Sequence, residues 1–160
     1  MTEIGHSAPG WDKPPVIIVG DAPADMEKSF PLLGKAAEKI SELAGIHLID
    51  YSRRTTRINV IPVYPGGIFP SGAARVWAQT LTRIGIFQTD SPVVLLGSNV
   101  AKAFDISRAA WFRWTRPIEV LGVRCITKVV SVPHPSARSA WWQDPHNEVR
   151  AERFWQANLW

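Results

Sequence analysis

The sequence predicts an α/β domain, a three-layer sandwich with a mostly parallel central sheet of about four strands. Two observations support this fold class. Short apolar runs that end in glycine occur at 15–20 and 92–97, as expected for strands buried on both faces of a sheet. Segments with helical spacing of apolar residues follow them, and strands that alternate with helices are typical of parallel sheets.

The first half of the chain opens with residues 1–14, which are polar and rich in proline and glycine, and we expect a flexible arm there. After the strand at 15–20, we expect a helix that follows Pro31 and ends at Gly45, because glycine commonly terminates helices. A polar and basic link then leads into a strand over 57–61.

The next helix is predicted over roughly 72–86, with Ser71 as its cap. Its apolar residues include Val76, Trp77, Leu81, Ile84 and Ile86. The strand at 92–97 leads directly into a short helix that Ser98 or Asn99 would cap.

Residues 111–132 read as two short strands joined at Leu121 and Gly122, the second running over 123–130. A terminal helix is expected from about Pro145. It would pack Val149, Phe154 and Trp155 against the rest of the protein.

Composition excludes several classes of protein. With 160 residues, 46% of them hydrophobic, residues 1–160 are expected to form one domain with its own core. No apolar run approaches the roughly 20 residues of a membrane span. The first residues hold no hydrophobic signal core, so we expect a cytoplasmic protein, and we expect it to be monomeric.

The chain has one cysteine, Cys125, which excludes an internal disulfide and any cluster held by several cysteines. We expect Cys125 to be a buried strand residue rather than a reactive thiol. The four histidines show no spacing typical of a metal site, so no metal and no cofactor is predicted.

The formal net charge of +4 suits a nucleic-acid partner, although it is also ordinary for soluble proteins. The eight tryptophans exceed what a core of this size needs, so some could serve as stacking or wedge surfaces. The remainder would lie in the core.

Four segments at or after strand ends stand out, and parallel sheets bind their ligands at the carboxyl ends of their strands. They read GDAPAD (20–25) closing with PLLGK (31–35), INV (58–60), LLGSN (95–99) and VPHPS (132–136). In this order they resemble the uracil-DNA glycosylase superfamily, nearest to its thermophile-type, iron–sulfur branch. The resemblance covers roughly residues 15–140. That branch holds its cluster with four cysteines, which this chain lacks.

The resemblance implies a uracil-DNA glycosylase-like fold and an enzyme that flips a base out of DNA and hydrolyses its N-glycosidic bond. We choose Asp21 to orient water and face the cationic sugar, with Asp25 in reserve; capping of the following turn is the alternative for Asp21. By resemblance, His134 donates a hydrogen bond to the leaving base, and the prolines around it keep that donor rigid. A surface histidine is the alternative.

The predicted base pocket contains Ala22, Phe30 and Asn59. The Asn59 amide offers both a donor and an acceptor to a base edge, or it closes a turn at the strand end. Phe30 would stack on the base, although its order relative to Pro31 is reversed from that of the family.

Three segments besides the tryptophan pair are predicted to contact DNA. Gly34 with Lys35, and Ser98 with Asn99, start helices whose N–H groups favour a phosphate. By resemblance, the loop at 136–138 presses into the duplex, so Ser136 would bond phosphate and Arg138 would fill the gap or pair with phosphate.

The consecutive tryptophans, Trp141 and Trp142, would stack or wedge at DNA, or else simply pack. Arg53, Arg54 and Arg57 form a basic run that could follow a phosphate backbone or face solvent.

The sequence thus predicts a monofunctional glycosylase that releases uracil or a modified pyrimidine without a Schiff base, because no lysine occupies a motif position that would suggest a lyase. Ala22 stands where the best-known branch carries its water-activating aspartate. A non-catalytic nucleic-acid-binding module on the same fold therefore stays open, as does an enzyme acting on a hypermodified base or a free nucleotide.

Overall fold

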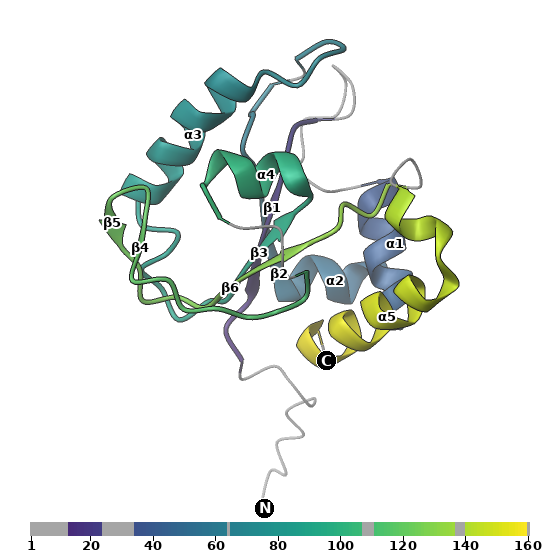
Figure 1. Ribbon diagram of the computed structural model, residues 1–160. Helices are drawn as coiled ribbons and strands as arrows, with labels where there is room; N and C mark the ends of the chain where they lie inside the picture. The colour runs from purple at the N-terminus through teal and green to yellow at the C-terminus, as the bar shows by residue number, and fades with distance from the viewer. Residues whose placement is uncertain (1–12, 24–33, 64, 107–110, 137–139, 160) are drawn as a thin grey trace, which may run out of the picture.

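The computed structural model describes residues 13–23, 34–63, 65–106, 111–136 and 140–159. Its main sheet has four strands in the order β2-β1-β3-β6, all of them parallel (Figure 1). The strands are β1 (Val16–Gly20), β2 (Thr55–Asn59), β3 (Val93–Leu96) and β6 (Val129–Val132). The predicted α/β class with a parallel four-stranded sheet is confirmed.

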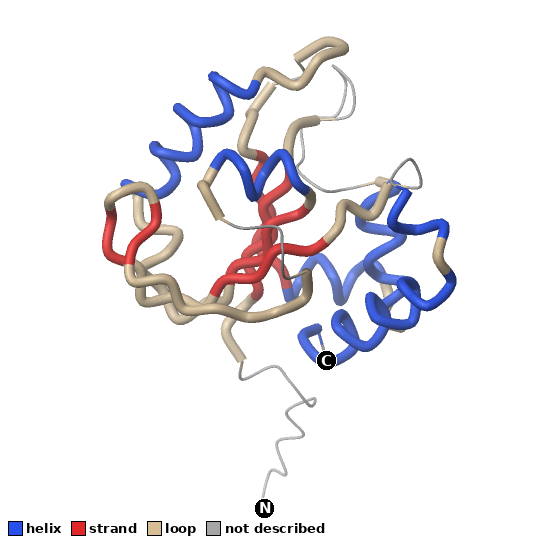
Figure 2. The backbone as a smooth tube through the Cα atoms, viewed as in Figure 1, coloured by secondary structure: helices blue, strands red, loops and turns tan. Residues whose placement is uncertain are grey.

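Helices cover both faces of this sheet and complete the three layers (Figure 2). One face carries α1 (Lys35–Ala44), α2 (Leu48–Arg54) and α5 (Pro145–Leu159). The other carries α3 (Ser71–Arg83), α4 (Ser98–Ala103) and the hairpin of β4 (Glu119–Val120) with β5 (Val123–Arg124). A 3-10 helix, η1 (Ala140–Gln143), precedes α5.

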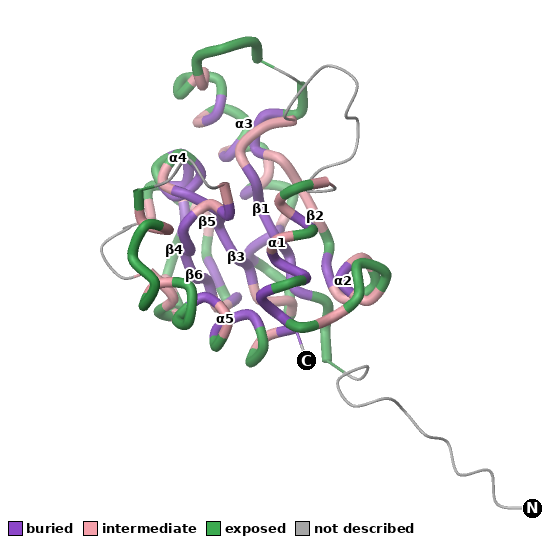
Figure 3. The backbone as a smooth tube through the Cα atoms, turned by 90° about the vertical axis from the view of Figure 1, so that its right-hand side faces the viewer, coloured by how far each residue is buried: buried purple, intermediate pink, exposed green. Residues whose placement is uncertain are grey.

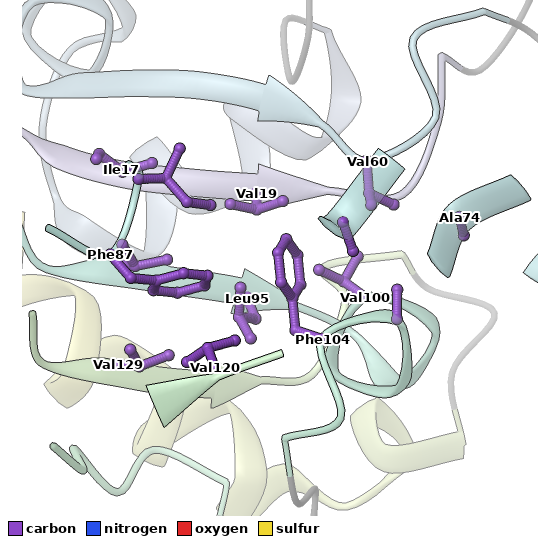
Figure 4. Packing of buried hydrophobic residues seen from close by; sticks show 14 of the residues in the cluster. Ile17, Val19, Val60, Ala74, Phe87, Leu95, Val100, Phe104, Val120 and Val129 are labelled. Carbon is purple, nitrogen blue, oxygen red and sulfur yellow. The ribbon is translucent and has the colours of Figure 1, made fainter. Parts of the chain in front are cut away.

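Strands β1, β3 and β6 are buried because both of their faces meet a helical layer, whereas β2 at the edge of the sheet is mostly half-buried (Figure 3). Alternate residues of one strand face opposite cores: Ile17 and Val19 join the α3/α4 side, and Val16 and Ile18 join the α1/α5 side. In Figure 4, the Phe104 ring lies among side chains of the core on the α3/α4 side. Continuous apolar runs were therefore the correct signal for these strands.

The basic link expected after Gly45 is wrong, because residues Leu48–Arg54 form helix α2. Its first turn carries Asp50 and its last turn carries Arg53 and Arg54, which complement the helix dipole. This order of charges in the sequence was a signal for a helix over these residues. The strand after it, β2, covers Thr55–Asn59 rather than 57–61, since it starts directly at the helix end.

The hairpin turn at Leu121 and Gly122 is confirmed, but the long strand predicted over 123–130 is two separate strands. Cys125 lies between them. It is buried as predicted, and burial raises the pKa of its thiol, but it is not a strand residue. Its S–H group donates to the Thr127 carbonyl at 3.3 Å.

Helix α3 buries the small residues Ala74, Ala78 and Thr82, and the helix packs against α4. Its larger apolar residues Val76 and Trp77 are exposed. Other corrections concern helix ends and faces: Ser71 begins α3 rather than capping it, and Val149 on α5 is exposed, whereas Phe154 and Trp155 are buried as predicted.

Across the described part of the chain, no helix combines the length and apolar character needed to cross a membrane. The same residues hold no group of three or more histidine, cysteine or acidic side chains that could bind a metal. The arm predicted at 1–14 falls almost entirely outside the described residues.

Candidate active site

The carboxyl ends of all four parallel strands meet at one edge of the sheet. Gly20 of β1 is the register partner of Asn59 of β2, and Leu96 of β3 is the partner of Val132 of β6. Polar segments that are remote in sequence therefore leave the sheet side by side. This edge is where the ligand of a parallel sheet is expected.

Asp21 leaves this edge first, directly after β1. Its backbone carbonyl accepts the Ile61 N–H at 2.7 Å, which extends the contact with the β2 segment beyond the end of the ladder. The Ala22 N–H donates to Asp21 Oδ1 at 2.8 Å. Asp21 thus has the local hydrogen bond of a turn residue, and its side chain is still 34% exposed and open to a second partner.

That second partner is His134, which follows β6. Its Nε2 atom lies 3.9 Å from Asp21 Oδ1, so the side chains of the two predicted catalytic residues lie next to each other at this edge of the sheet. Asp21 and His134 come from non-adjacent strands, β1 and β6, and only the folded sheet brings them together.

The His134 imidazole is held in one tautomer. The Ser136 N–H donates to Nδ1 at 3.1 Å, so Nδ1 carries a lone pair and the neutral ring has its proton on Nε2. Burial lowers the pKa of His134, and the nearby Asp21 carboxylate opposes that shift with a smaller effect. The ring is therefore neutral at pH 7, with an N–H donor on the Asp21 side.

Gly97 lets this loop pack closely. It has a φ of 88° and a ψ of 168°, a conformation essentially restricted to glycine, and its N–H donates to the Val132 carbonyl at 2.7 Å. A Cβ atom there would lie only 3.1 Å from the Cβ of His134. The sequence motif included Gly97, but the close contact between Gly97 and the His134 side chain was not predicted. A glycine directly after a buried strand was the available signal.

Asn59 ends β2, beside Gly20 and hence beside Asp21. Its Oδ1 atom is buried and has no hydrogen-bond partner among the described residues. The alternative that this oxygen closes a turn therefore finds no bond to support it. A buried amide oxygen without a partner is costly, so the arrangement suits an acceptor that waits for a ligand.

Trp141 and Trp142 lie in η1 and pack rather than project. Their rings meet edge to face with centroids 4.7 Å apart, both are half-buried, and both rest against the α1/α5 core. The Trp142 Nε1–H donates to the His134 carbonyl at 2.8 Å. The pair thus supports the packing alternative, and Trp142 positions the His134 loop, which the sequence did not indicate.

The predicted phosphate contacts lie at two helix starts. Gly34 precedes α1 with a φ of 102°, and Lys35 is exposed. The predicted cap role of Ser98 and Asn99 is wrong: Ser98 is the first residue of α4, and neither side chain caps it. Helix α4 begins at the carboxyl edge, because it follows β3 after the single residue Gly97.

Three predicted residues, Asp25, Phe30 and Arg138, lie outside the described residues. Ala22 is half-buried next to Asp21. Ser136 contributes its backbone N–H to His134, so its described role is to orient the ring.

Arg53 and Arg54 lie at the opposite edge of the sheet, because Thr55 directly after them pairs with Val16 at the amino ends of the strands, and Arg57 pairs with Ile18 in the middle of β1. Arg57 donates to Thr55 Oγ1 at 2.8 Å and lies over the Tyr51 ring, and Arg54 donates to the Leu159 carbonyl. These two guanidinium groups are used within the fold. The run does not extend the candidate site.

Comparison with family models and with curated proteins finds no match for this chain. The resemblance to the uracil-DNA glycosylase superfamily therefore stays a prediction.

Proposed function

We propose that this protein is a DNA glycosylase-like enzyme that flips uracil or a modified pyrimidine and hydrolyses its N-glycosidic bond. The observation that carries the proposal is the 3.9 Å approach of His134 Nε2 to Asp21 Oδ1 at the carboxyl edge of a parallel sheet. A neutral donor and a carboxylate at one point suit a reaction that develops opposite charges on neighbouring atoms.

His134 would act on the leaving base. When the bond between the sugar carbon and the base nitrogen breaks, its electron pair stays on the base and spreads to the carbonyl oxygen beside it. The Nε2–H can donate to that oxygen, and because Ser136 and the flanking prolines fix the ring, the donor needs no reorganisation as charge builds. The low pKa of His134 keeps the ring neutral beforehand.

Asp21 would act on the sugar. Its carboxylate faces the cationic carbon left by the departing base and orients a water for attack there. The water oxygen forms the new bond to that carbon, and the released proton passes to the carboxylate or to solvent. The hydrogen bond from Ala22 fixes one carboxylate oxygen and leaves the other for this role.

Asn59 would read the base. Its unpartnered, buried Oδ1 matches a ring N–H, and its amide N–H₂ group can donate to a carbonyl on the same base edge. This donor and acceptor pattern fits uracil-like pyrimidines, and it provides selectivity because a mismatched base would leave the amide oxygen unpaired.

A non-catalytic nucleic-acid-binding module is the second candidate. Ala22 favours it, because no second carboxylate accompanies Asp21 in the described part of this loop.

An assay for abasic sites distinguishes the two candidates. The protein is incubated with duplex and single-stranded oligonucleotides that contain uracil, hydroxymethyluracil, xanthine or hypoxanthine, and strands are cleaved at abasic sites by alkali. Release of uracil or hydroxymethyluracil supports the enzyme. Salt-sensitive binding without release on any substrate supports the module.

A further inference from the structure

A cavity lies away from the candidate active site, on the α3/α4 side of the sheet. Its volume is about 600 Å³, which is within the size range of small-molecule sites. It is lined by α3, the segment after α4, the segment that leads into β4, the β4–β5 hairpin and β6. Asp21, Asn59 and His134 are not among its lining residues, so the proposed glycosylase reaction does not use it.

The inner wall of this cavity is apolar. Phe104, Val120 and Val129 line it and are at most 2% exposed. Figure 4 shows Val120 of the hairpin next to Val129 of β6, with the Phe104 ring close by. Such a wall suits the face of a flat ring.

A hydroxyl without a partner lies in this wall. Ser131 on β6 lines the cavity and is only 3% exposed, and its Oγ has no hydrogen-bond partner among the described residues. Its backbone carbonyl is already used, since it accepts the Phe112 N–H at 3.0 Å. Burial of an unpaired hydroxyl costs free energy that a ligand group reaching Oγ would recover.

The described side chains that line the cavity carry equal numbers of positive and negative charges. Arg75 Nη2 lies 3.9 Å from Asp105 Oδ2, and Arg75 Nη1 donates to the Ala103 carbonyl at 3.2 Å. Arg113 and Glu119 are exposed, one of each sign. Among the described lining residues, the two positive charges equal the two negative ones, so a neutral ligand fits best.

Two more polar groups in the cavity limit the class of ligand that it can bind. Gln79 contributes an amide, and the Thr115 hydroxyl, which donates to the Val129 carbonyl at 3.2 Å, keeps its lone pairs as acceptors. A hydroxyl and an amide each donate and accept, so a ligand that carries both a carbonyl and an N–H can bond to both of them. We propose that this cavity binds a neutral, planar ring compound that carries an adjacent carbonyl and N–H, as aromatic carboxamides and nucleobases do.

The test uses the full chain, labelled with ¹⁵N, and follows backbone amide shifts on addition of benzamide, benzoate or benzamidine. These compounds share ring and size but are neutral, anionic and cationic. Uracil is a fourth probe that separates nucleobases from carboxamides. We expect benzamide to shift the signals of Phe104, Val120 and Ser131, with a Kd on the order of 1–10 mM for so small a compound.

Ser131→Ala should weaken benzamide binding at least about fivefold. Ser41→Ala is the matched control, because Ser41 is also a buried serine with an unpartnered Oγ, but it faces the opposite core and should leave binding unchanged. Shifts of the same signals by uracil as well would support the proposed ligand class for nucleobases in addition to carboxamides.

Three results would overturn the proposal. They are no shift of cavity signals up to about 20 mM benzamide, equal binding by the Ser131→Ala protein, and tighter binding of benzoate or benzamidine than of benzamide.

Discussion

The backbone of Gly97 lies against the side chain of His134, so closely that a Cβ atom at position 97 would meet the His134 Cβ at 3.1 Å. The end of β3 is thus the surface on which the imidazole rests. This contact links an ordinary strand-end glycine to the chemistry proposed for the neighbouring loop.

Gly97→Ala should therefore displace the imidazole as well as strain the backbone. We expect a loss of about 1–3 kcal/mol in the free energy of unfolding, and a rate of base release lower by at least about 10-fold. Denaturant unfolding and single-turnover assays measure the two effects. Gly122→Ala is the control: its φ is 79°, so it is strained too, but nothing lies within 4 Å of the added Cβ. If both variants lost the same activity, the contact with His134 would not matter.

Much of this geometry could be predicted from the sequence. The buried strands were visible as continuous apolar runs, and parallel strands must place their carboxyl ends at one edge, which is why Asp21, Asn59 and His134 could be assigned to one site. The close packing could not be predicted. Strand order and the fit between Gly97 and His134 depend on contacts between distant segments, which no local pattern records.

Helices α2 and α3 also show where a local sequence pattern fails to predict the structure. The exposed positions of Val76 and Trp77 run against their hydrophobicity, because the small Ala74 and Ala78 occupy the buried face of α3, in the core shared with α4. Helix α2 was missed for its polar content, although its charges follow the helix dipole.

Asn59→Val should separate binding from stability. Removing a buried oxygen that lacks a partner should leave the free energy of unfolding unchanged or raise it by up to about 1–2 kcal/mol, while uracil release falls by at least about 10-fold. Ser41→Ala removes another unpartnered, buried oxygen and should leave release unchanged. Thermal unfolding and steady-state kinetics of both variants give the comparison. A destabilised Asn59→Val protein with normal release would mean that Asn59 is structural.

His134 should make stability depend on pH. Burial lowers its pKa in the folded protein below the ordinary value of 6.5, so between these two values the unfolded chain binds more protons. The free energy of unfolding should therefore fall as the pH drops through about 6.5, and level off, for this group, below the folded pKa.

Urea unfolding of the wild type and of His134→Gln between about pH 7.5 and pH 5 measures this contribution as the difference in slope. The variant should lose less stability on acidification. Identical slopes would show that His134 titrates normally and that its ring is not held neutral by burial.

The central claim is that His134 and Asp21 act on one extruded nucleotide, and a single-turnover experiment tests it most directly. The rate constant for uracil release from duplex DNA is measured for the wild type, His134→Gln, Asp21→Asn and the double variant, with DNA affinity measured in parallel. We predict that each single change lowers the rate by about 100-fold or more at unchanged affinity, and that the double variant is little slower than the slower single one. Wild-type release by His134→Gln would contradict the account.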